Sequence, residues 1–176
     1  SDVIKLSEIL EVMKKMGYTG TKHEESSENL KDREKEEHLK REFLEFKIAI
    51  IFSAIVFYIA MGTMVGLPVP PIISPDINPL NFAIVQFILA LPVVYIGRRF
   101  YIVGIKQLFM KSPSMDSLIA TGTGSALIYS IYGTFKIAEG DYHYVHSLYF
   151  ESAVVILALI LLGKYLEGVS KGKTSE

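Results

Sequence analysis

The sequence lacks cysteine altogether, and it lacks charge over long stretches. Without cysteine among the 176 residues, a disulfide framework and a thiolate metal site are both excluded within the chain. Charged residues still make up 21% of the total, so they must be segregated. Residues 48–75, 77–97 and 117–135 contain no charge, and residues 147–163 contain only Glu151.

These uncharged runs are long and apolar. Half of the residues are hydrophobic, and the mean hydropathy is +0.34. A helix needs about 20 apolar residues to cross about 30 Å of hydrocarbon, and four runs of this kind outweigh a buried soluble core. The sequence therefore predicts an all-α membrane protein with four transmembrane helices, over residues 43–66, 80–97, 116–137 and 148–167.

The region before the first run is polar. Residues 1–20 have the pattern of a short amphipathic helix, capped by Ser7 and ended by Gly17. Because so short a helix is marginal alone in water, we interpret it as the tail of a larger soluble unit. Residues 21–42 place Glu near Lys or Arg at helical spacing, which predicts a solvated helix or a partly disordered linker.

The distribution of positive charge predicts the orientation. Residues 67–79 contain no Lys or Arg, whereas residues 98–115 contain four and the tail after residue 163 contains three. Cytoplasmic loops carry the excess of positive charge, so both ends of the chain are expected in the cytoplasm. If the source is prokaryotic, the membrane is the plasma membrane.

A basic amphipathic segment follows the second predicted helix. Gly97 allows a bend at the membrane boundary, and Arg98 and Arg99 can reach lipid phosphates. Residues 100–110, with Lys106, then predict a helix lying on the membrane surface as a platform. The alternative is a plain surface anchor.

Three residues are candidates for ion binding. Ionisable groups within membrane spans are costly, which makes Glu151 and Glu167 functional candidates. The two lie roughly 24 Å apart along one helix. The alternatives are a residue at a span boundary for Glu151 and an ordinary interfacial carboxylate for Glu167. Met115 offers a soft thioether suited to Cu(I), although methionine at a helix start more often serves packing.

Several segments resemble one family. "GRRFYIVGIKQL", "SPSMDSLIATGTGSALIYS" and "LYFESAVVILALILLGKYLE" are similar to the first four membrane helices of heavy-metal P-type ATPases, with the Cu(I)-exporting branch closest. "VIKLSEILEVMKKMGYTG" resembles the end of a ferredoxin-like heavy-metal-binding domain. The resemblance implies such a tail over 1–20, a linker over 21–42, a transmembrane module over 43–167, and the start of a cytoplasmic actuator region over 168–176.

The resemblance also implies roles for the candidate residues. Met115 and Glu167 match the positions that take up copper from the cytoplasm, and Glu151 matches an exit-side glutamate. Gly97 matches the second glycine of a double-glycine kink, the first being replaced here by Ile96. The platform with Arg98, Arg99 and Lys106 would receive copper from a chaperone or from the pump's own metal-binding domain.

The chain lacks other motifs of that family. It contains no CPC, DKTGT, TGE or CxxC sequence, so it is expected to be a piece that cannot hydrolyse ATP without the remaining core helices and cytoplasmic domains, where Mg-ATP binds. The resulting expectation is the membrane portion of an ATP-driven Cu(I) exporter that also accepts Ag(I), embedded in the lipid bilayer and without a nucleic-acid partner. Two alternatives stay open: a Zn(II)-type heavy-metal pump, and a non-enzymatic membrane scaffold or sensor anchor.

Overall fold

The computed structural model describes the backbone of residues 2–173 and the side chains of residues 27–173. This part of the chain is helical and contains no strand. Its elements are α1 (Asp2–Gly62), η1 (Pro71–Ile73), α2 (Pro79–Ile96), α3 (Arg98–Phe109), α4 (Met115–Ala138), η2 (Tyr142–Ser147) and α5 (Phe150–Lys173). The chain divides into two compact units, Ser1–Arg41 and Glu42–Glu176.

The first unit is helical, and its described side chains are exposed except for Leu39, which is partly buried. Lys35 pairs with Asp32 at 3.8 Å and Lys40 with Glu36 at 4.0 Å, at the helical spacings the sequence predicted. The solvated-helix interpretation is therefore confirmed over residues 27–41. The predicted helix end at Gly17 is wrong, because α1 continues through it. A glycine inside a helix costs about 1 kcal/mol relative to alanine and does not forbid the helix.

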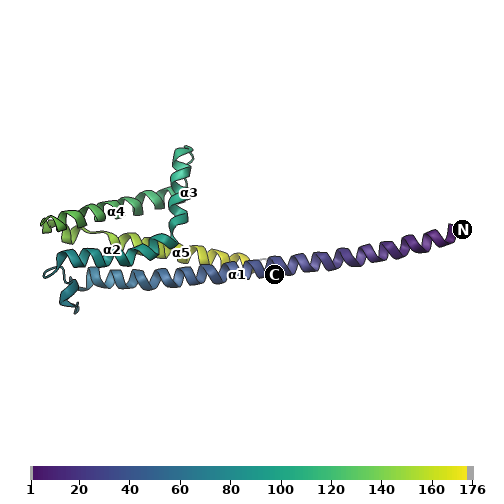
Figure 1. Ribbon diagram of the computed structural model, residues 1–176, viewed down its shortest axis with the longest axis horizontal. Helices are drawn as coiled ribbons and strands as arrows, with labels where there is room; N and C mark the ends of the chain where they lie inside the picture. The colour runs from purple at the N-terminus through teal and green to yellow at the C-terminus, as the bar shows by residue number, and fades with distance from the viewer. Residues whose placement is uncertain (1, 174–176) are drawn as a thin grey trace. The chain divides into compact units, whose positions relative to one another are not determined.

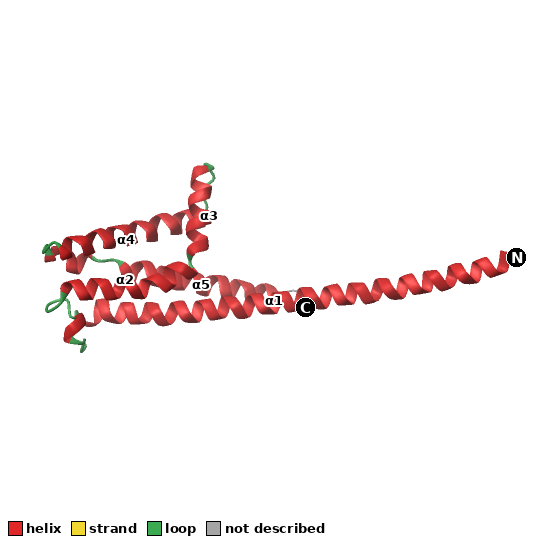
Figure 2. Cartoon of the chain, viewed as in Figure 1, coloured by secondary structure: helices red, strands yellow, loops and turns green. Residues whose placement is uncertain are grey.

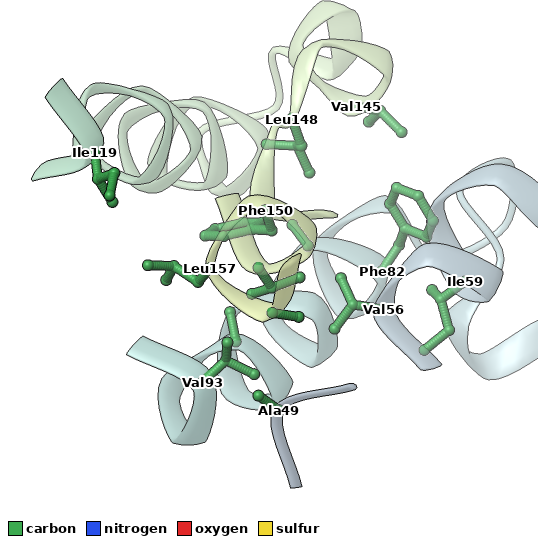
Figure 3. Close-up of a cluster of buried hydrophobic side chains, with 14 of the residues drawn as sticks. Ala49, Val56, Ile59, Phe82, Val93, Ile119, Val145, Leu148, Phe150 and Leu157 are labelled. Atoms are coloured by element: carbon green, nitrogen blue, oxygen red, sulfur yellow. The ribbon is translucent and has the colours of Figure 1, made fainter. Parts of the chain in front are cut away.

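In the second unit, residues 42–62 of α1 run roughly parallel to α2, α4 and α5, while α3 runs across them (Figures 1 and 2). The first turns of α5 lie at the centre of the core, where Phe150 and Leu157 are fully buried. Figure 3 shows these two side chains between Ile119 of α4 and Val93 of α2. A hydrogen bond ties α1 to α5, because the Ser53 hydroxyl donates to the Val154 carbonyl at 3.0 Å.

Among the described residues, three helical segments are long and apolar enough to cross a membrane: residues 27–62, 79–96 and 142–173. Their apolar windows are only 22%, 28% and 44% buried, so most of this apolar surface faces outward, as contact with lipid requires. The prediction of four spans is not confirmed, because α4 is not among these segments. Glycine and hydroxyl residues over 121–125 dilute the apolar content of α4.

The crossing of α3 and α4 requires a glycine. A Cβ added to Gly104 would lie 2.6 Å from the carbonyl carbon of Asp116 and 2.9 Å from the Cβ of Ala120. The Ser117 hydroxyl donates to the Gly104 carbonyl at 2.8 Å across the same contact. The start of α4 is thus held against the middle of α3 by backbone atoms.

We expect Gly104→Ala to destabilise the chain by about 1–3 kcal/mol, because the added methyl group overpacks against backbone that must move. The measurement is thermal unfolding in detergent, followed by circular dichroism. Gly122→Ala in α4 is the matched control, since a Cβ there meets nothing within 4 Å. Equal midpoints for the two variants would contradict the close crossing.

Candidate functional site

The start of α5 is fixed to α4 by a buried hydroxyl. Ser130 Oγ donates to the Ala126 carbonyl at 2.7 Å and accepts the backbone N–H of Tyr149, also at 2.7 Å. This pair of hydrogen bonds holds the residues just before α5 against α4. It therefore positions the first turn of α5, which carries Glu151.

Glu151 is buried and incompletely paired. It is 6% exposed, and the Ser152 hydroxyl donates to its Oε1 at 3.4 Å. Its Oε2 has no hydrogen-bond partner among the described residues. A buried ionised carboxylate is costly unless it is paired, so this oxygen can attract a proton or a cation.

Met115 is the first residue of α4 and is 66% exposed. The turn before it is fixed by a capping box in which Ser114 and Ser117 exchange hydrogen bonds with each other's backbone. Ser114 also bonds the side chain of Gln107 in α3. The thioether therefore projects from a well-anchored helix start and is accessible to a ligand.

Glu167 lies in the C-terminal half of α5 and is half exposed. Lys171 Nζ lies 2.6 Å from its Oε1, one helical turn further along. A cation that binds this carboxylate must therefore compete with Lys171. The start of α4 and the C-terminal half of α5 lie toward the same end of the bundle (Figure 1). No cluster of three or more His, Cys, Asp or Glu side chains suited to a metal occurs among the described residues.

Gly97 separates α2 from α3, and the chain changes direction there (Figure 1). Its φ of −79° is open to any residue, so the bend itself does not require glycine. The requirement comes from packing, because an added Cβ would lie 3.1 Å from Leu157 Cδ2. Arg98 folds back onto α2, donating to the Tyr95 carbonyl at 3.1 Å with its guanidinium 4.3 Å from the Tyr95 ring centroid. Arg99 is exposed.

Helix α3 is amphipathic. Phe100 and Gly104 are buried, whereas Lys106 is exposed. The exposed apolar side chains of this helix are Ile102, Ile105, Leu108 and Phe109. The Tyr101 hydroxyl lies 2.8 Å from Thr123 Oγ1 of α4. Burial raises the pKa of Tyr101 and this hydrogen bond lowers it, with burial the larger effect, so the phenol is neutral at physiological pH.

Sequence reasoning missed two residues. Gln86 of α2 is fully buried, and its Oε1 has no partner among the described residues. The sequence did contain a signal for Gln86, because an amide side chain in an uncharged run is itself a functional candidate. Gly104 gave no comparable signal, since an isolated glycine in a helical pattern does not reveal which backbone approaches it.

The long apolar helices, their outward-facing apolar surface and the buried carboxylate define a helical integral membrane protein. The chain is 37% identical over 172 residues to a copper-transporting ATPase of Helicobacter pylori, covering 96% of the chain and 22% of that protein. It is 35% identical over 169 residues to a probable copper-importing P-type ATPase A of Enterococcus hirae, again covering 96% of the chain and 22% of that protein. It is 40% identical over 134 residues to the copper-transporting ATPase HMA5 of Oryza sativa subsp. japonica, covering 76% of the chain and 13% of that protein.

The chain is homologous to a segment of the copper-transporting ATPases, one of which is named as a P-type ATPase. It spans about a fifth of the length of the bacterial relatives, 22% in each case. No family model matches the chain. No solved structure matches it either.

Neutralising the two carboxylates of α5 should change the free energy of unfolding by different amounts. We expect Glu151→Gln to raise the free energy of unfolding by about 1–3 kcal/mol, because it removes a buried and incompletely paired charge. Glu167→Gln should change it by less than about 0.5 kcal/mol, because exposed ion pairs contribute little. Chemical denaturation of both variants at neutral pH in detergent measures this. A loss of stability in Glu151→Gln would show that the carboxylate is structurally satisfied.

Proposed function

We propose that the chain is the membrane portion of an ATP-driven Cu(I) exporter that also accepts Ag(I). The observation that carries the proposal is its similarity, over 96% of its length, to proteins named as copper-transporting ATPases. The names of the relatives agree on copper, which disfavours the Zn(II) alternative. One relative is named as probably importing copper, so the direction of transport is part of the proposal.

Met115 and Glu167 are proposed to take up copper on the cytoplasmic side. Their exposure supports this role, because both are accessible at the same end of the bundle (Figure 1). The thioether is a soft ligand that prefers Cu(I) to Zn(II). Glu151 is proposed to act on the exit side, where its burial and its unpaired oxygen support transient contact with a departing cation.

We further propose that α4 also spans the membrane, in addition to the three segments over residues 27–62, 79–96 and 142–173. Five of its hydroxyl groups are satisfied within the helix, which removes the main objection to placing them in lipid. Each donates to the carbonyl four residues earlier, at 2.7–2.8 Å: Thr121, Thr123, Ser125, Ser130 and Thr134. Four spans also place both ends of the chain in the cytoplasm, as the loop charges predict.

In this arrangement α3 is the platform on the cytoplasmic membrane surface. Its exposed apolar side chains suit the lipid interface, and Arg99 and Lys106 offer positive charge to a copper chaperone or to the pump's own metal-binding domain. Residues 1–20 are proposed as the tail of such a domain, residues 21–42 as its linker, and residues 168–176 as the start of the actuator region. Remaining core helices and cytoplasmic domains would supply Mg-ATP hydrolysis.

The test uses the full-length pump in membranes, with ATP hydrolysis measured against Cu(I), Ag(I) and Zn(II). We expect stimulation by Cu(I) and Ag(I), and a higher half-activating Cu(I) concentration in Met115→Ala, by about tenfold, the equivalent of about 1.4 kcal/mol of lost binding. Copper accumulation in sealed inside-out vesicles tests export. Stimulation by Zn(II) alone would overturn the metal assignment, and no response to any metal would favour the scaffold.

Lys171 competes with cations for the Glu167 carboxylate. Removing it should therefore lower the half-activating Cu(I) concentration, the reverse of the effect expected for Met115→Ala. In Lys171→Ala the carboxylate no longer pairs with the ammonium, so a cation binds without displacing it. We expect the half-activating Cu(I) concentration to fall about twofold, since exposed pairs contribute at most about 0.5 kcal/mol at this spacing. Lys173→Ala, the removal of another lysine near the end of α5, is the control. Equal shifts in both variants would indicate a general effect of charge.

A further inference from the structure

Two buried side-chain oxygens lack a hydrogen-bond partner among the described residues: Oε2 of Glu151 and Oε1 of Gln86. Gln86 is fully buried, and its amide nitrogen donates only a long hydrogen bond, 3.4 Å, to the Phe82 carbonyl of its own helix. Other buried polar side chains are satisfied, as Ser53, Thr123 and Ser130 show with hydrogen bonds of 2.7–3.0 Å. The two exceptions lie on α2 and α5.

These two helices pack together where the exceptions occur. The rings of Phe87 and Phe150 lie 5.8 Å apart between centroids. Gln86 and Glu151 are the direct sequence neighbours of these two phenylalanines, so each lies within one helical turn of this contact along its own helix. Further along, Gly97 of α2 closely approaches Leu157 of α5. The α2–α5 interface is therefore closely packed, and the two unsatisfied oxygens belong to residues that directly adjoin one of its contacts in sequence.

A packing role does not explain Gln86. Its neighbours on the buried face of α2 are Ala83, Ala90 and Val93, so the surroundings along that helix are apolar. An apolar side chain of similar size would avoid leaving a buried acceptor unpaired. Polar groups retained at such a cost within a membrane are functional candidates.

We propose that Gln86 is a second polar residue of the exit site, contributing its carbonyl oxygen beside Glu151 to the cation that leaves the membrane. This inference rests on the proposed function, in which that cation is Cu(I). Oxygen ligands bind a soft cation weakly. Weak binding is what an exit site needs, because an ion must be able to leave the site that it enters. Gln86 thus acts in release and not in uptake.

The test compares Gln86→Leu with wild type in the full-length pump. We expect kcat for Cu(I)-stimulated ATP hydrolysis to fall about tenfold, equivalent to about 1.4 kcal/mol of barrier. The half-activating Cu(I) concentration should stay within about twofold, because uptake is untouched. The thermal midpoint in detergent should be equal or higher, since an unpaired buried group has been removed. An unchanged kcat would show that Gln86 takes no part in release.

Ser53→Ala is the matched control. It also removes a buried polar group from the bundle, but one that is hydrogen-bonded to the Val154 carbonyl. We expect a lower thermal midpoint and an unchanged kcat, the reverse of Gln86→Leu. In the double variant Gln86→Leu with Glu151→Gln, kcat should fall by less than the product of the single effects, as for residues that act together.

The outcomes separate this inference from the proposed function. If wild type responds to Cu(I) and Gln86→Leu retains its kcat, the exit role of Gln86 is overturned while the copper pump stands. A lower midpoint together with a lower kcat in Gln86→Leu would assign the residue to folding and would also overturn the inference. If wild type shows no response to Cu(I), the proposed function fails first, and the role of Gln86 fails with it.

Discussion

A membrane-spanning chain must satisfy its polar groups without water, and the structure of the second unit follows from this constraint. Helices satisfy their own backbone, which explains why the described residues form helices joined by short connections. The same constraint governs the side chains of α4, whose hydroxyls return to carbonyls of their own helix. Ser130 does more, since it also accepts the N–H of Tyr149 where the backbone leaves regular helix before α5.

Because other buried polar side chains are hydrogen-bonded, the two buried oxygens without a partner point to a functional role. Glu151 and Gln86 each retain a buried oxygen without a partner in the described part of the chain, although α2 and α5 are otherwise closely packed. A sequence selected for stability alone would place apolar residues at both positions. Local departures from packing rules are expected where function opposes stability. Both departures adjoin the same contact between α2 and α5, so a single cause explains them better than two separate ones.

Much of the helical pattern followed from the sequence alone, because charge marks where each helix can lie. Helices α2 and α4 begin and end within one residue of the predicted 80–97 and 116–137. Helix α5 extends six residues beyond the predicted end, since Glu167 and Lys171 pair along the helix and continue it. The close approach at Gly104 and the burial of Gln86 were beyond prediction, because both depend on which faces meet. For the candidate site, the residues of α5 were identified from charge, but their contrasting exposure required the structure.

That contrast between Glu151 and Glu167 bears on how an ion could pass. Glu167 is half exposed and pairs with Lys171, so a solvent cation can reach it without any change in helix packing. Glu151 is 6% exposed at the α2–α5 interface, so an ion can reach it only if the helices around it separate. One end of α5 is therefore open and the other is closed in this conformation. A path closed at one end conducts only when coupled to a conformational change, which is the step that ATP hydrolysis would drive in the proposed pump.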